Sequence, residues 1–206
     1  MGLVLGMAAA ANANAQPVGN PNLLSDPGFE SGTSVPSSMG GWWAYLHATF
    51  SQTYQHSGAW SMETYYSGNG FQGFSVQKVA ATPGVTYSLT GWAFTPNTLG
   101  SSSSVGFVTL AFLDVNGLLI GPILTSPMLN NASPANIWTQ LSLSGTAPAN
   151  TVSMIAETML LNSGPGDAVY FDDLSLTVVP EPSTSAWLSA GLGFGLLVRR
   201  YHRRAA

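Results

Sequence analysis

Carboxylates are the side chains in this sequence with the most scope for chemistry, because cysteine is absent and only three histidines occur. Glu30 and Asp172 form the first candidate pair. Asp172 has the same parity as Leu174 and Leu176, which predicts a carboxylate on the core-facing side of a late strand. Such a carboxylate needs a cation or several hydrogen-bond donors. Since Lys78 is the one lysine of the chain, a metal ion is the more available partner.

Calcium suits oxygen ligands of this kind, because it accepts carboxylate and carbonyl oxygens in a flexible geometry. The alternative is that Glu30 accepts backbone N–H bonds and that no metal binds. If calcium binds, we expect the ion to stabilise the fold and to have no part in catalysis.

Motifs for other chemistry do not occur. The sequence contains no Gly-x-Ser-x-Gly elbow, no Gly-x-x-x-x-Gly-Lys loop and no His-Glu-x-x-His helix. We therefore expect a protein that is not an enzyme. A small polysaccharide-active enzyme with Glu63 and Glu157 as its carboxylate pair is a remote alternative.

Tryptophan offers a different chemistry, because its face can stack on the apolar C–H surfaces of sugars. The candidates are Trp42, Trp43, Trp60, Trp92 and Trp138. Tryptophan is highly buried on average, and we expect Trp42, Trp43 and Trp60 to lie in the core.

Trp92 and Glu157 are predicted to differ from the other candidates. Trp92 has the parity of the hydroxyl residues in 86–90 and should leave the core side of its strand, and Glu157 has the parity of Ser153. An outward tryptophan and a carboxylate on neighbouring strands could line a glycan-binding groove.

Short strands must position these side chains. Glycine (23) and proline (13) are plentiful and charged residues make up 7% of the chain, which favours strands and tight turns over a helical bundle. Alternating patterns predict strands at 85–90, 105–113, 118–120, 138–143, 151–161 and 168–178. Asn116-Gly117 is a strong hairpin signal. About nine or ten strands at this spacing predict a single all-β sandwich over residues 17–179.

The N-terminal segment has features of a signal peptide. Residues 3–11 form a short apolar run, and Ala-Asn-Ala at 13–15 offers a cleavage site. No basic residue precedes the run, so either the true start codon lies upstream or the segment is a disordered tail. We expect residues 1–15 to be a signal peptide.

The C-terminal segment has features of a membrane anchor. Residues 182–198 are uncharged, and this is the minimal length of a transmembrane helix. Arginines follow at once at Arg199, Arg200, Arg203 and Arg204, which favours a cytoplasmic location of that end. We expect one transmembrane helix after the β-sandwich.

Pro180, Glu181 and Pro182 stand directly before this run. The order of Pro-Glu-Pro, apolar run and arginine cluster over 180–206 resembles the PEP-CTERM sorting signal. The resemblance implies recognition by exosortase, a membrane-embedded protease of Gram-negative bacteria that make extracellular polysaccharide. The two prolines keep Glu181 extended, which suits presentation to a protease.

The central region resembles carbohydrate-binding-module jelly rolls with a galactose-binding-domain-like fold. The opening segment 22–32, Asn-Leu-Leu-Ser-Asp-Pro-Gly-Phe-Glu-Ser-Gly, carries the resemblance, and 41–42, 56–58, 85–89, 112–117 and 169–174 follow in order. The resemblance implies a structural calcium held by Glu30, the Gly28 carbonyl and Asp172, with Asp173 as a substitute for Asp172. It is specific for the fold and weak for a ligand.

Charge and targeting together indicate an exported protein. The central region contains eight acidic residues and one basic residue, Lys78. Its net negative charge repels phosphate groups, so nucleic acid is an unfavourable partner. Our leading hypothesis is a non-catalytic envelope or extracellular-matrix protein, processed by exosortase and transiently anchored in the inner membrane. The alternative is a carbohydrate-binding module for an extracellular polysaccharide.

Overall fold

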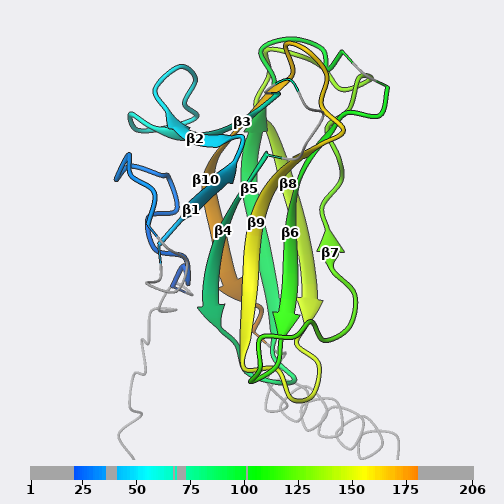
Figure 1. Cartoon of the computed structure of the whole chain (residues 1–206). Coiled ribbons are helices and arrows are strands. Elements are labelled where there is room, and N and C mark those ends of the chain that lie inside the picture. Colours follow the sequence, from blue (N-terminus) through cyan, green and yellow to red (C-terminus); the bar gives the residue numbers. More distant parts are fainter. Residues whose placement is uncertain (1–20, 36–40, 67, 69–72, 101, 181–206) are drawn as a thin grey trace, which may run out of the picture.

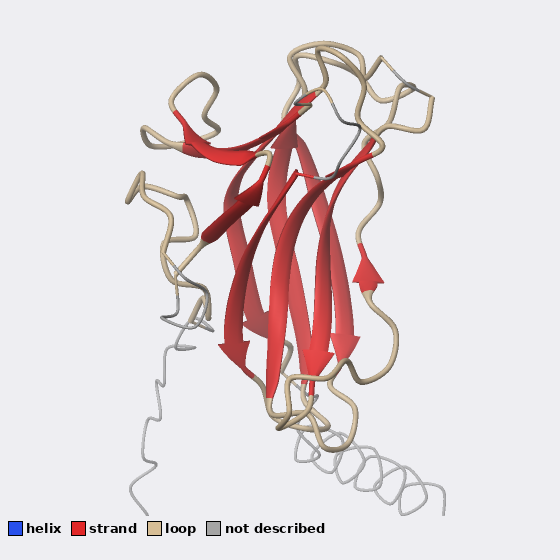
Figure 2. Ribbon diagram, viewed as in Figure 1, coloured by secondary structure: helices blue, strands red, loops and turns tan. Residues whose placement is uncertain are grey.

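The computed structural model describes residues 21–35, 41–66, 68, 73–100 and 102–180. These residues form ten β-strands in two sheets and no helix (Figures 1 and 2). Accordingly, this part of the chain contains no helix that could cross a membrane. The predicted signal peptide and, apart from Pro180, the predicted sorting signal lie outside the described residues.

Two five-stranded antiparallel sheets form the sandwich. The front sheet, nearer the viewer in Figure 1, has the order β1 (Trp43–Leu46), β4 (Gly73–Ala80), β9 (Ser153–Leu161), β6 (Val105–Leu113), β7 (Leu124–Thr125). The back sheet has the order β2 (Ala48–Ser51), β3 (Ser61–Tyr65), β10 (Ala168–Val178), β5 (Thr86–Phe94), β8 (Thr139–Thr146). From β3 to β6 and from β7 to β10, consecutive strands alternate between the sheets, so the chain repeatedly crosses over the core.

The core lies between the inner faces of the two sheets. The inner positions hold aliphatic and aromatic side chains that are at most 2% exposed: Leu110, Phe112, Met154 and Leu160 in front, and Leu89, Leu141, Phe171, Leu174 and Leu176 behind. Each fully buried side chain of this size stabilises the fold by about 1.5–3 kcal/mol. The all-β sandwich predicted from the alternation is confirmed.

Trp42 closes one side of this core, as predicted. It is 1% exposed and packs on Phe29, with the ring centroids 4.9 Å apart. Its indole N–H donates a 3.0 Å hydrogen bond to the Asp26 carbonyl, which satisfies the one polar group of the buried ring.

Most predicted strands are present. β6 and β10 have the predicted bounds, and β5, β8 and β9 overlap their predictions. The segment 118–120 is different, because it contributes a single bridge between Leu119 and Leu113 and no full strand. The predicted Asn-Gly turn is confirmed by a positive φ of 78° at Gly117 and a 2.9 Å bond from the Asp114 N–H to the Leu118 carbonyl.

The predicted orientation of Asp172 is wrong. Asp172 pairs with Trp92, whereas Ser175 pairs with Thr90, so β10 contains one extra residue between these pairs. Asp173 adopts a positive φ of 48° within this bulge. Because the extra residue resets the two-residue period, Asp172 lies on the outer side of β10. It is nevertheless fully buried, since the loop between β2 and β3 covers it.

Candidate functional site

The outer face of the front sheet carries an ordered array of side chains, which we call the platform. Its first rung contains Tyr45, Phe74, Met159 and Phe107, its second Trp43, Val76, Glu157 and Thr109, and its third Lys78, Ile155 and Ala111. These positions are fixed by cross-strand register, because residues two apart on each strand share one face. The platform is thus mostly apolar, with a carboxylate at its centre.

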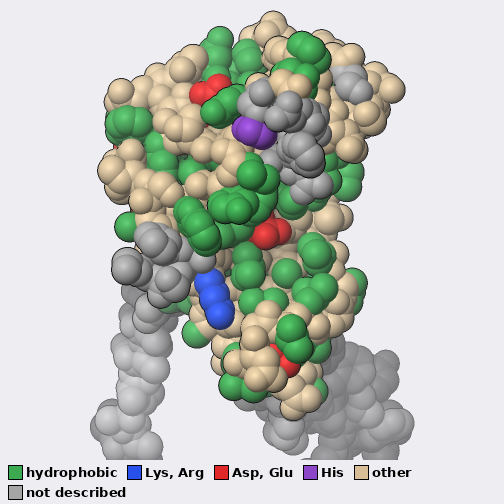
Figure 3. All heavy atoms as spheres, in the orientation of Figure 1, with side chains coloured by type: hydrophobic (Ala, Val, Ile, Leu, Met, Phe, Trp, Pro, Cys, Tyr) green, Lys and Arg blue, Asp and Glu red, His purple; other side chains and the backbone are tan. Residues whose placement is uncertain are grey.

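An aromatic cluster forms the β1 edge of the platform. Trp43 and Tyr45 are 42% and 43% exposed, respectively. Their ring centroids lie 5.3 Å apart, and Tyr45 lies 5.1 Å from Phe74 on the adjacent strand. Figure 3 shows hydrophobic side chains gathered on this face, with acidic atoms among them. Exposed rings in contact with one another form a firm surface on which sugar rings can stack.

Glu157 is held within this apolar face by a neighbouring hydroxyl. The Thr109 Oγ1 donates a 2.7 Å hydrogen bond to Glu157 Oε2 across the β6–β9 pair. Burial raises the pKa of the Glu157 carboxyl, and the bond from Thr109 lowers it in part. An ionised carboxylate accepts up to four hydrogen bonds, so Glu157 has the capacity to accept bonds from ligand hydroxyls in addition to that of Thr109.

The sequence prediction that Trp92 and Glu157 line one groove is wrong. Both point away from the core, as predicted, but Trp92 is on β5 of the back sheet and Glu157 is on β9 of the front sheet. The two side chains therefore lie on opposite outer faces of the sandwich. Parity assigns a residue to a face of its strand, but it does not say to which sheet that strand belongs.

The outer face of Trp92 is covered by His56. The two rings stack with centroids 4.3 Å apart and an interplanar angle of 14°, and Trp138 meets the His56 ring edge-on at 5.4 Å. His56 Nδ1 also lies 2.6 Å from an oxygen of Asp173. Trp92 is thus less open to a ligand than Trp43.

Sequence reasoning missed Tyr45, and it considered Trp43 as a candidate but assigned it to the core. Trp43 was expected in the core, yet it is among the most exposed aromatic side chains of the described residues. Trp42 and Trp43 are consecutive on an extended segment, so they must face opposite sides, and only one of them can be inward. The pattern Trp-x-Tyr at 43–45 was the available signal for an outward aromatic pair.

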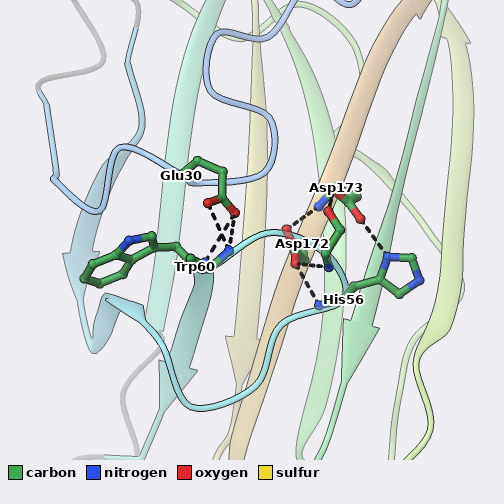
Figure 4. Close-up of polar contacts among 7 residues, drawn as sticks. Glu30, His56, Trp60, Asp172 and Asp173 are labelled. Atoms are coloured by element: carbon green, nitrogen blue, oxygen red, sulfur yellow. Dashed lines mark hydrogen bonds and ion pairs between the residues drawn. The ribbon is translucent and has the colours of Figure 1, made fainter.

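The predicted metal ligands meet at one corner of the fold. A Cβ atom added at Gly28 would lie 3.7 Å from side-chain atoms of both Asp172 and Glu30 and 3.5 Å from the Asp173 carboxylate. The opening segment therefore lies against the last strand, as the resemblance implied. The loop between β2 and β3, residues 52–60, covers this corner (Figure 4).

Backbone N–H groups of that loop bind the carboxylates. Glu30 accepts bonds from the Ala59 N–H at 3.0 and 3.1 Å and from the Trp60 N–H at 3.3 Å. Figure 4 shows the Glu30 carboxylate directed at these peptide groups and Asp172 directed at another part of the loop. This is the arrangement that the alternative to calcium binding requires.

Asp172 accepts three backbone bonds, two from the loop and one from β10. The donors are the N–H groups of His56 at 2.8 Å, Ser57 at 3.1 Å and Asp173 at 2.7 Å. Burial raises the pKa of the Asp172 carboxyl to about 6, and these donors lower it in part.

A calcium ion does not fit the carboxylates in this arrangement. Their oxygens face N–H dipoles, which present positive charge and would repel a cation. In addition, the described residues contain no group of three or more acidic, histidine or cysteine side chains suited to hold a metal. Calcium binding by Gly28, Glu30 and Asp172 stays a prediction, and it would require the 52–60 loop to rearrange.

Comparison with solved structures identifies the fold. A family 16 carbohydrate-binding module superimposes with a TM-score of 0.51 at 21% identity, over 76% of this chain and 99% of that chain. A family 61 module in complex with β-1,4-galactotriose gives 0.53 at 15% identity, over 77% and 99% of the two chains. The fold is that of the carbohydrate-binding-module jelly rolls.

The same fold also occurs as one part of longer proteins. The enzymatically active domain of the bacteriophage CBA120 tailspike protein 4 matches with a TM-score of 0.58 at 14% identity. This chain covers only 21% of that one, whereas the match spans 77% of this chain. No family model matches the sequence, and no curated protein is similar to it. At these identities the likeness shows the fold alone.

Proposed function

We propose that this domain is a non-catalytic carbohydrate-binding module that binds an extracellular polysaccharide on the platform. The observation that carries the proposal is the exposed pair Trp43 and Tyr45 on the same sheet face as Glu157, with β4 between them. The aromatic rings supply apolar faces for stacking, and Glu157 supplies an acceptor for sugar hydroxyls. A largely apolar surface with a few placed polar groups is the usual composition of a small-molecule site.

The platform is a better glycan site than the Trp92 face. Trp92 already stacks on His56, so a sugar would have to displace that ring before it could stack. Trp43 is 42% exposed, so part of its ring is open to a ligand. Lys78 on the third rung adds a donor to the acceptor at Glu157.

The proposal includes the cellular location of the protein. We infer that the domain is exported, anchored by residues 182–198 and processed by exosortase at the Pro-Glu-Pro motif, in the inner membrane of a Gram-negative bacterium. What supports this is the sequence order of Pro180, Glu181 and Pro182, the apolar run and the four arginines. A polysaccharide-rich envelope would be a fitting place for a glycan-binding domain.

Binding to a panel of polysaccharides tests the function. We expect wild-type protein to bind at least one glycan and Trp43→Ala or Tyr45→Ala to weaken that binding about tenfold or more, because truncation of a hot-spot aromatic costs about 2 kcal/mol or more and about 1.4 kcal/mol corresponds to tenfold. Trp92→Ala is the matched control, as it removes an outward tryptophan from the opposite face. Binding that is lost in Trp92→Ala and kept in Trp43→Ala would contradict the proposed site.

A further inference from the structure

One end of the sandwich gathers three loops and the point where the described chain stops. Ala80 and Leu113 both pair with Ser153, Thr86 pairs with Thr146, and Tyr87 pairs with Val178. The strands β4, β6, β8 and β10 therefore end where β5 and β9 begin. We call this the lower end, after its place in Figure 1; its loops are 81–85, 114–123 and 147–152, and the chain leaves it at Pro180.

Hydrogen bonds tie the lower-end loops to the sheets and to one another. The Val152 N–H donates to the Leu113 carbonyl at 2.9 Å, and the Ala81 N–H donates to the Val152 carbonyl at 3.2 Å. The Val179 N–H donates to the Thr86 carbonyl at 2.8 Å, so the exit of the chain is fixed to the same end. Because these bonds hold the loops in place, the lower end has a defined surface.

The lower end exposes aliphatic side chains. Val115 is 81% exposed, Leu118 64%, Leu119 49% and Val152 47%. Single exposed apolar residues are ordinary on a protein surface, but four aliphatic side chains on two adjacent loops are a group. Gly121 lies against Pro148, which places the 114–123 and 147–152 loops side by side.

Charge is nearly absent from these loops. Asp114 is the one charged residue in 81–85, 114–123 and 147–152. Its Oδ1 accepts 2.8 Å bonds from the N–H groups of Asn116 and Leu118, so the carboxylate holds the hairpin in shape. A surface with exposed aliphatics and little charge is suited to the boundary of a lipid layer, where apolar groups enter and the remaining polar groups stay hydrated.

The length of chain beyond Pro180 brings this end close to a bilayer. The uncharged run of the sequence begins at Pro182. Two residues span at most about 7 Å in an extended chain, and the headgroup layer on one side of a bilayer is about 5 to 8 Å thick. If residues 182–198 cross the membrane, the tether is therefore too short to hold the lower end clear of the headgroups.

We propose that the lower end docks on the lipid surface of the membrane that holds the C-terminal run, with Val115, Leu118, Leu119 and Val152 in contact with lipid. The inference rests on the anchoring part of the proposed function. Docking at this end points the long axis of β4, β9 and β6 away from the membrane and leaves the platform at the side of the domain, open to polysaccharide (Figure 1). It also places the Pro-Glu-Pro motif at the membrane surface, where a membrane-embedded protease can reach it.

Single-cysteine labelling tests the contact on the full chain, since the native sequence has no cysteine. Val115→Cys and Val152→Cys report the lower end. Asn131→Cys is the control, because Asn131 is an exposed turn residue near Leu129, which bridges to Gly106 at the start of β6 and hence at the opposite end. Each variant carries a nitroxide label and is reconstituted in vesicles of phosphatidylethanolamine and phosphatidylglycerol.

We expect the labels at 115 and 152 to collide severalfold more with oxygen, which enters lipid, than with a water-soluble nickel chelate, relative to the label at 131. The lipid contact would be overturned if the labels at 115, 152 and 131 had the same ratio of oxygen to nickel-chelate accessibility. The anchor would stand if that protein still floated with the vesicles and resisted carbonate extraction. Protein that carbonate extracts would overturn the anchor and the inference with it. Spin–spin broadening at 115 at low protein-to-lipid ratio would overturn the inference in favour of contact with a second copy.

Discussion

Thr109 and Glu157 face each other across the β6–β9 pair, and the threonine hydroxyl donates a 2.7 Å hydrogen bond to the carboxylate. This bond favours the ionised form of the carboxylate at the centre of a mostly apolar platform. Without it, the carboxylate would be harder to keep ionised, because burial alone favours the neutral acid.

The first prediction concerns the pH dependence of glycan binding. Burial raises the pKa of Glu157 and the Thr109 bond lowers it, so Thr109→Val should raise that pKa further. If the ionised carboxylate accepts hydroxyl groups of the glycan, affinity should fall as the pH drops through the Glu157 pKa, and the fall should begin at higher pH in Thr109→Val. Binding isotherms from pH 4 to pH 8 measure this, with Glu157→Gln as the variant that loses the pH dependence. Identical profiles for all three proteins would show that Glu157 has no part in binding.

The second prediction concerns Asp172 and stability. The pKa of the folded carboxyl is about 6, above its ordinary value of 3.8, so the folded state binds the proton more tightly than the unfolded state does. The free energy of unfolding should therefore fall as the pH rises from about 4 to about 6 and stay level above that window. At about 1.4 kcal/mol per pKa unit, the change is on the order of 3 kcal/mol. Urea unfolding over this range measures it, and the difference from Asp172→Asn isolates this group from the other acids. A wild-type curve parallel to that of the variant would contradict the prediction.

The third prediction concerns the bonds between Glu30 and the 52–60 loop. Glu30→Ala leaves the N–H groups of Ala59 and Trp60 without their acceptor and should lower the free energy of unfolding by about 1 kcal/mol, since both groups lie near solvent. Gly58→Ala should cost at least as much, because Gly58 has a φ of 62° and an added methyl group would collide with the Glu30 carboxylate. Ala59→Gly keeps the peptide donor and serves as the control. Equal stability of wild type and Glu30→Ala would mean that the loop does not depend on this carboxylate.

The fourth prediction concerns calcium. With the carboxylates of Glu30 and Asp172 bound to N–H groups as in this structure, excess chelator should leave the melting temperature unchanged. A native-state ion at a hundred times its dissociation constant would add about 2.7 kcal/mol, which is several degrees in a domain of this size. Such a rise with calcium, lost in Asp172→Asn, would establish the site that the family resemblance implied and would require the loop to change its bonds.

The fifth prediction concerns sorting. Glu181→Ala should leave uncleaved precursor in the membrane if the Pro-Glu-Pro motif is the signal that a protease recognises, because the two flanking prolines favour an extended backbone at that residue. Ser183→Ala, just beyond the motif, is the matched control. Intact mass and cell fractionation give the result. The same terminal mass for wild type and Glu181→Ala would remove the exosortase proposal.

The fold could be predicted because its signal is local. Alternation along 105–113 and 168–178 gives each strand its inner and outer face whatever its partners are, and the Asn116-Gly117 turn is determined by the few residues around it. The outward orientation of Trp92 and of Glu157 follows from the same alternation. The opening motif with Glu30 also indicated which two parts of the chain would meet, since it lies against the last strand.

The sequence by itself therefore determined that the chain forms a β-sandwich and that side chains such as those of Trp92 and Glu157 leave its core. Only the tertiary structure decided which of them share a surface. Glu157 shares the platform with Trp43 and not with Trp92, because the sheet that a strand joins depends on pairing between residues far apart in the chain. Likewise, the bulge in β10 decides which face of the strand Asp172 lies on. Its carboxylate therefore points away from the core and accepts hydrogen bonds from backbone N–H groups of the 52–60 loop, which is distant in the sequence.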